Sequence, residues 1–293
     1  MNQSTTYFDG LGRPIQSVTT QGSPDKQDLV QPIAYDAFGR EPKKYLPYAA
    51  GTNGQYKADA LTAQGSFYQN ATGVAHDNHP FALTQFDASP LNRVLEQGAP
   101  GTAWQPKGGV DASGNTVKLL QRTNTANEVL RCDYRFATGR VSSAGSYEAR
   151  QLLVSQTTDE HGLKMLEYRD KEGRVVAKKV QEVKDNESSY LTTAYVYDDL
   201  ALQRLVIQPQ GMANLAELST HYDRFVSQWC YAYDYDARRR QVSKRVPGAE
   251  PVWMVYNRRD ELVLNQDGNG RNGTTANAPT SGTSASTTPW DGW

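Results

Sequence analysis

The chain has 293 residues, with 31 basic and 32 acidic side chains and a formal net charge of −1 at pH 7. Because the two signs are intermixed, the composition excludes a broad positive surface for nucleic acid or anionic lipid. No apolar run is long enough to predict a membrane span, and tyrosine (17) far outnumbers phenylalanine (7), which is typical of strands with one wet face.

The first predicted elements, in residues 5 to 48, contain two copies of a short motif. An aspartate is followed three residues later by glycine and then by arginine, and the motif recurs twice further along the chain. A tyrosine (Tyr7, Tyr35 or Tyr168) precedes three of the four aspartates. Such repetition indicates one structural unit used several times. The motif residues are Asp9, Gly12 and Arg13; Asp36, Gly39 and Arg40; Asp170, Gly173 and Arg174; and Asp267, Gly270 and Arg271.

Turn geometry explains two residues of the motif. An aspartate can accept hydrogen bonds from backbone N–H groups two or more residues ahead, and a glycine three positions later tolerates the positive φ of a bulged hairpin turn. Tyrosine before the turn and branched residues after it favour paired antiparallel strands. The motif therefore predicts hairpins, and only the arginine is left without a complete local explanation. We expect it to pair with an acidic or aromatic neighbour on the next hairpin, or to face a ligand.

Between the repeats, the chain contains segments of different composition. Residues 51–80 form an insert in which residues 57–68 predict one short helix, and the Gly- and Pro-rich stretch 98–116 predicts a surface loop. Strand patterns then continue from Val117 to Gln266, with looser copies of the motif at Tyr197-Asp198, Tyr222-Asp223 and Tyr235-Asp236. Residues 272–293 are low in complexity and predict a disordered tail. We therefore expect a mainly β repeat domain over residues 1–271, built as an open or spiralling antiparallel sheet.

These motifs resemble the RHS or YD-repeat proteins of bacteria. The resemblance rests on the Tyr-Asp…Gly-Arg units, on residues 7–16 (YFDGLGRPIQ) and on residues 89–101 (SPLNRVLEQGAPG). It implies that the repeats form part of a β-sheet shell of the polymorphic-toxin type, at the cell surface or outside the cell. Neighbouring repeats of a longer chain or assembly are the partners it implies.

The chain also departs from that family. Its shells often end in a core with Asp-Pro dipeptides, and this sequence has none. We therefore expect a segment or a degenerate member of the family, without self-cleavage. The first thirty residues contain no apolar run typical of a signal peptide.

Catalytic patterns are weak. His76 and His79 lack a third metal ligand, and Cys132 and Cys230 have neither the flanking cations of an activated thiolate nor a spacing that demands a disulfide. No P-loop, G-x-S-x-G or H-E-x-x-H motif occurs. We therefore expect no enzymatic activity, no metal and no cofactor.

Two functions from different classes remain. The first is a structural scaffold, in which the tyrosines pack across strands. The second is carbohydrate binding, because exposed aromatic rings with a polar rim suit a sugar ring. The candidate ligand-binding residues are Tyr197, Tyr233, Tyr235 and Trp253.

Overall fold

The computed structural model describes residues 3–107, 114–185 and 187–268. Within these ranges the chain divides into two compact units. Unit 1 comprises residues 1–121 and 155–165, and unit 2 comprises residues 122–154 and 166–293. Both consist mainly of antiparallel strands, so the predicted mainly β fold is confirmed. The predicted disordered tail, residues 272–293, lies outside the described residues.

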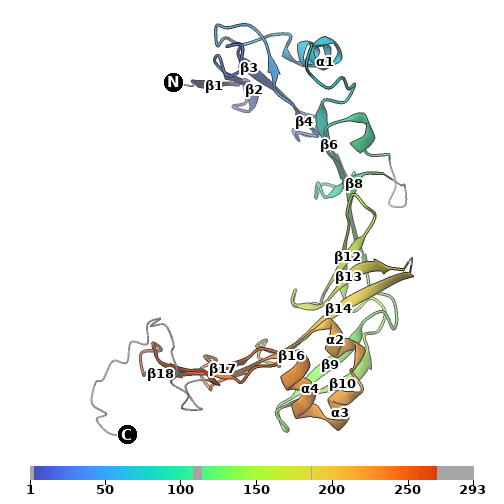
Figure 1. The fold of residues 1–293 in the computed structure, drawn as a ribbon, viewed down its shortest axis with the longest axis vertical. Helices are drawn as coiled ribbons and strands as arrows, with labels where there is room; N and C mark the ends of the chain where they lie inside the picture. Colours follow the sequence, from blue (N-terminus) through green and yellow to red (C-terminus); the bar gives the residue numbers. More distant parts are fainter. Residues whose placement is uncertain (1–2, 108–113, 186, 269–293) are drawn as a thin grey trace. The chain divides into compact units, whose positions relative to one another are not determined.

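Unit 1 begins with paired strands that form the successive hairpins seen in blue in Figure 1. Strand β3 pairs with β2, β4 and β5, and the sheet continues through β4, β6, β7 and β8. The strands are β1 (Ser4–Phe8), β2 (Pro14–Thr19), β3 (Leu29–Ala34), β4 (Lys43–Tyr45), β5 (Tyr48–Ala49), β6 (Phe81–Phe86), β7 (Val94–Gly98) and β8 (Thr116–Thr123), the last continuing into unit 2.

A helix covers part of this sheet. Helix α1 (Ala60–Asn70) lies in the insert where the sequence predicted one, and Ala60 joins Val18, Val30 and Tyr48 in a buried cluster. The stretch 98–116 contains a short 3₁₀ helix, η1 (Thr102–Trp104), between β7 and β8. Buried residues alternate with half-buried ones along β2 and β3, as expected for strands with one face more fully covered than the other.

Unit 2 contains a longer run of hairpins. Adjacent strands from β13 to β19 pair antiparallel in chain order, and β9 pairs with β10 in a separate two-stranded sheet. The strands are β9 (Leu130–Arg135), β10 (Arg140–Ser146), β13 (Val175–Lys184), β14 (Glu187–Tyr197), β15 (Gln203–Ile207), β16 (Cys230–Tyr235), β17 (Gln241–Arg245), β18 (Val252–Tyr256) and β19 (Leu262–Gln266). Two further strands, β11 (Leu153–Thr158) and β12 (Lys164–Arg169), contribute residues to both units.

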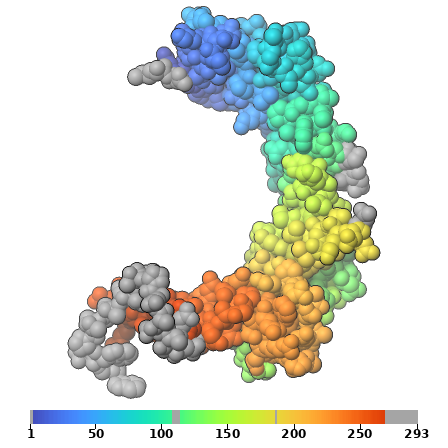
Figure 2. All heavy atoms as spheres, in the orientation of Figure 1, coloured from blue at the N-terminus to red at the C-terminus, as the bar shows by residue number. Residues whose placement is uncertain are grey.

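The prediction of a single helix was wrong, because three more helices connect β15 to β16. They are α2 (Pro209–Ala213), α3 (Glu217–Thr220) and α4 (Tyr222–Trp229). Leu218, Phe225 and Val226 bury against Val141 and Ile207, so the helices and the β9–β10 hairpin share one core. Figures 1 and 2 show the helices, in orange, beside the hairpin, in green. Tyr222-Asp223, interpreted as a repeat copy, begins α4 instead. Its spacing from Phe225, Val226 and Trp229 is helical, and that signal was in the sequence.

Candidate functional site

Each motif turn that the structure describes in full is closed by its own aspartate. In the turn 170–174 the Asp170 N–H donates to the Arg174 carbonyl (3.0 Å) and the Gly173 N–H donates to the Asp170 carbonyl (3.0 Å). The Asp170 carboxylate accepts the N–H groups of Glu172 (3.1 Å) and Arg174 (2.9 Å), and its other oxygen accepts Arg174 Nε (2.7 Å). Gly173 has a φ of 81°. The aspartate and glycine therefore have the structural role that the motif predicted.

The same backbone pattern recurs in turns without the full motif. Ala201, Arg239 and Asp260 occupy the glycine position with φ values of 62°, 63° and 63°. Glycine is thus preferred but replaceable, since a few side chains tolerate this region. The turns with this pattern are 9–13, 36–40, 159–163, 170–174, 198–202, 236–240 and 257–261. Of the predicted turn at Asp267, Gly270 and Arg271 lie outside the described residues.

The arginine reaches the next hairpin as well as its own aspartate. Arg174 lies with its guanidinium carbon 5.3 Å from the ring centre of Tyr197, the residue directly before the next turn. The equivalent guanidinium-to-ring distances are 4.5 Å for Arg13 and Tyr35, 4.7 Å for Arg40 and Phe86, and 4.9 Å for Arg240 and Tyr256. A guanidinium at this distance is attracted to the ring face. The arginine therefore couples consecutive hairpins.

The tyrosine before the turn makes a second contact with the preceding hairpin. Its hydroxyl donates to the carbonyl of the residue that directly follows the preceding turn. The pairs are Tyr35 to Pro14 (2.9 Å), Tyr197 to Val175 (3.1 Å), Tyr235 to Gln203 (3.1 Å) and Tyr256 to Gln241 (3.0 Å). Two contacts thus connect each such hairpin to the next, one through the arginine and one through the tyrosine. We call this arrangement the turn ladder.

The strand register is the same at each of these four junctions. The third residue after a turn pairs with the residue three positions before the next tyrosine, and we call this third residue the inner position. The pairs are Gln16 with Pro32, Ala177 with Ala194, Leu205 with Ala232, and Ser243 with Trp253. Gln16 is 1% exposed, Ala177 0%, Leu205 3% and Ser243 3%. The inner position is buried at these four junctions, whereas Lys43, which pairs with Leu83 in the same register after the turn 36–40, is half-buried.

One departure from the motif keeps the ladder contacts. After the turn 198–202 the arginine comes two residues late, as Arg204, which lies on the same face of the strand. Its Nε donates to the fully buried Asp198 carboxylate (2.7 Å), and its guanidinium lies 5.2 Å from the Tyr235 ring and 4.9 Å from the Tyr134 ring. Sequence analysis missed Arg204, although the period of two along a strand was a usable signal.

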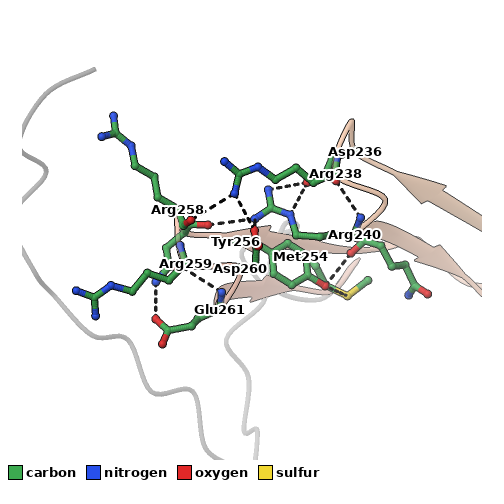
Figure 3. A network of polar contacts seen from close by, with 11 residues as sticks. Asp236, Arg238, Arg240, Met254, Tyr256, Arg258, Arg259, Asp260 and Glu261 are labelled. Atoms are coloured by element: carbon green, nitrogen blue, oxygen red, sulfur yellow. Dashed lines mark hydrogen bonds and ion pairs between the residues drawn. The ribbon is translucent and has the colours of Figure 1, made fainter.

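The last described ladder turn replaces the charged pair. In the turn 257–261 Glu261 occupies the position that an arginine holds in the full motif. The Asn257 side-chain amide donates to the Glu261 carboxylate (2.7 Å). Asp260 instead accepts Nη1 of Arg238 (2.9 Å) and of Arg240 (2.6 Å), as Figure 3 shows. Neighbouring turns are therefore also joined through their tips.

Hydrogen bonds to the carboxylate of Asp9, in the turn 9–13, change its acidity. The backbone N–H of Arg13, followed by its guanidinium, holds the pKa of Asp9 below its ordinary value despite partial desolvation. Glu128, in unit 2, is the strongest case outside the turns. Burial would raise its pKa, but hydrogen bonds from Arg122, the Thr125 N–H and Tyr168 outweigh burial and lower the pKa to about 2.

The structure places the four predicted ligand-binding residues in different surroundings. Tyr197 and Tyr235 belong to the turn ladder, with their hydroxyls engaged as described above. Tyr233 and Trp253 line one cavity of about 230 Å³. Tyr197 also lines a separate groove of about 810 Å³ in unit 2, together with Tyr147 and Tyr195. The structure thus brings together only Tyr233 and Trp253 of the four.

The structure describes the surroundings of the metal-ligating side chains and of the two thiols. They contain no cluster of three or more His, Cys, Asp or Glu side chains arranged to hold a metal ion. Burial raises the pKa of Cys132 to about 11 and that of Cys230 to about 12, so neither thiol is activated. Separately, none of the helices among the described residues has the length and apolar character needed to cross a bilayer.

A family model and several solved structures are similar to this chain. A family model described as a domain of unknown function, DUF6443, matches residues 1–117. No curated protein is significantly similar in sequence.

Solved structures with a similar fold include the crystal structure of TcdB2-TccC3 (TM-score 0.55, 12% identity) and that of TcdB2-TccC3-Cdc42 (TM-score 0.55, 12% identity). A Photorhabdus luminescens Tc holotoxin pore with a TccC3 mutation also matches (TM-score 0.52, 12% identity). Each match covers 91% of this chain and 11% of the other. The chain therefore shares its fold with a small part of much longer proteins.

Proposed function

We propose that this chain is a non-catalytic scaffold, a wall segment of an RHS or YD-repeat assembly. The observation that carries the proposal is the turn ladder, which sets the same strand register at four junctions in two units. Inner positions as different as Gln16 and Leu205 are accommodated, so the repeat conserves the geometry of the sheet and not a chemical site. That property suits a wall that is extended one hairpin at a time.

The fold shared with TcdB2-TccC3 supports this proposal. We propose a toxin-associated context from this likeness, with the assembly at the cell surface or outside the cell. Neighbouring repeats are the partners, and neither nucleic acid nor a membrane is among them. The near-neutral charge agrees with partners that pair through backbone hydrogen bonds and apolar contacts.

Electron cryo-microscopy of the complete natural polypeptide that contains residues 1–293 tests this proposal. We expect the strands of both units to lie within a continuous sheet that borders or encloses another part of the protein. A particle in which these strands form an isolated domain, separate from any other sheet, would refute the wall-segment function. The variant Arg174→Ala with Tyr197→Phe should loosen the wall locally, whereas Lys171→Ala, in the same turn, should not.

A second candidate function is saccharide binding in the groove of about 810 Å³. The observation that favours it is a wall with Tyr147 and Tyr195 together with Arg131, Asp133 and Gln151, which combines ring faces with polar groups. A glycan array with the full chain tests it. Retention that Tyr195→Ala abolishes and Tyr233→Ala preserves would place the ligand in this groove, and an array without any retained glycan would remove the candidate.

A further inference from the structure

Two neighbouring turns of unit 2 contain a cluster of arginines. The turns 236–240 and 257–261 belong to adjacent hairpins, because β17 pairs with β18. Together they contain five arginines and three carboxylates, which leaves a net charge of +2, whereas the whole chain has a net charge of −1. None of the other five described turns with the same backbone pattern has an arginine among its three central residues. The arginines are Arg238, Arg239, Arg240, Arg258 and Arg259.

The carboxylates of these turns are all engaged within the turns. Arg240 donates to Asp236 through Nε (2.7 Å) and to Asp260 through Nη1 (2.6 Å). Arg238 Nη1 donates to Asp260 as well (2.9 Å). The third carboxylate, that of Glu261, accepts a side-chain amide of its own turn. Two of the five arginines therefore use the acidic groups that the turns supply.

The other three arginines have no acidic partner. Arg239, Arg258 and Arg259 are exposed, and within the described part of the chain their guanidinium groups form no ion pair or hydrogen bond. Figure 3 shows the side chains of Arg258 and Arg259 extending away from the contacts to Asp260. Arg239 also occupies the glycine position of its turn, with a φ of 63°, where an arginine is less favourable than glycine. We call these three residues the arginine tips.

We propose that the arginine tips bind an acidic peptide segment of another protein through its carboxylates. The Asp260 carboxylate shows the mode of binding, because it accepts two guanidinium groups at once. A guanidinium presents its N–H donors in a planar fork that matches a carboxylate, and the arginine tips offer three such forks side by side. This partner is additional to the neighbouring repeats, and the proposal does not depend on the scaffold function.

Other anions suit these turns less well. The three central residues of each turn include no aromatic side chain, whereas single-stranded nucleic acid and saccharides are usually bound against ring faces. The nearest rings are occupied, since Tyr235 lies under Arg204 (5.2 Å) and Tyr256 under Arg240 (4.9 Å). An anionic membrane is bound by larger basic clusters or by inserted apolar side chains, and these turns have neither. A flexible acidic peptide needs only the guanidinium groups.

Fluorescence anisotropy of a fluorescein-labelled hexaglutamate peptide, titrated with the full chain, tests the proposal. We expect saturable binding in 50 mM NaCl that weakens in 300 mM NaCl, because salt screens exposed charges. The double variant Arg258→Gln with Arg259→Gln should weaken binding about fivefold. This change corresponds to about 1 kcal/mol for the loss of two exposed ion pairs.

A matched pair of single variants separates binding from stability. Arg239→Gly and Arg150→Gly each remove one exposed arginine with a positive φ, 63° and 65° respectively. Because glycine tolerates this region, both variants should unfold at a temperature at least as high as the wild type. Only Arg239→Gly should weaken hexaglutamate binding, by about twofold. Equal weakening by both would reduce the effect to net charge and would overturn the proposal.

Three other results would overturn it. One is the absence of hexaglutamate binding in 50 mM NaCl, and another is binding that the double variant leaves intact. The third is tighter binding of a heparin hexasaccharide or of phosphatidylserine vesicles than of hexaglutamate, lost in the same double variant. The occupant would then be a sulfated saccharide or a membrane. The microscopy described above does not report on this contact, so the two proposals can fail separately.

Discussion

The hydrogen bonds to Glu128 predict a stability that depends on pH. The carboxylate accepts the Tyr168 hydroxyl (2.8 Å), the Thr125 N–H (2.8 Å) and both terminal nitrogens of Arg122, and the Glu128 carbonyl accepts Lys179 Nζ (2.6 Å). A pKa lowered from 4.5 to about 2 corresponds to about 3 kcal/mol of stability for a fully sheltered group. Because the side chain is 15% exposed, solvent screening reduces this to about 2 kcal/mol.

The sign follows from the lowered pKa. The unfolded chain binds the proton first as the pH falls, so the contribution is complete above about pH 5 and is lost as the pH falls from 4.5 towards 2. Glu128→Gln should therefore lower the free energy of unfolding by about 2 kcal/mol at pH 7, and by progressively less below pH 4.5.

Urea denaturation followed by tryptophan fluorescence, at pH 7, 5 and 3.5, measures this difference. Glu187→Gln, at the exposed end of β14, is the control and should cost nothing measurable at any pH. A Glu128→Gln penalty that is as large at pH 3.5 as at pH 7 would show that the charge of Glu128 does not contribute, and would refute the reasoning.

Three further predictions concern the ladder and the thiols. Tyr197→Phe should destabilise unit 2 by about 1 kcal/mol in urea denaturation, because the Val175 carbonyl loses its donor. Tyr195→Phe should not, since this hydroxyl has no hydrogen-bond partner among the described residues. Gly173→Ala should lower the free energy of unfolding by about 1 kcal/mol, because Gly173 has a positive φ, although nothing lies within 4 Å of the added methyl group. Gly10→Ala, the control, should leave stability unchanged. Equal stability of both variants would contradict the turn type. Cys132 and Cys230 should resist a thiol reagent at pH 8 until the protein is unfolded, because burial raises their pKa values; rapid labelling of the folded chain would show that they are exposed.

The local rules of hairpin formation were readable along the chain. Aspartate and glycine at fixed spacing define a turn through contacts within five residues, so Asp170 and Gly173 had their roles before any tertiary contact was known. The covered face of β2 was not readable in this way, because Gln16 is buried beside the half-buried Ile15. The helices between β15 and β16 were missed because a strand interpretation was extended through Tyr222.

Sequence by itself determined that this protein is a series of bulged antiparallel hairpins, since turn chemistry and side-chain alternation act over a few residues. Only the tertiary structure decided how one hairpin meets the next. The Tyr197 hydroxyl bonds the carbonyl of Val175, 22 residues earlier, and its ring contacts the guanidinium of Arg174, 23 residues earlier. Both contacts depend on strand register, which no local pattern specifies.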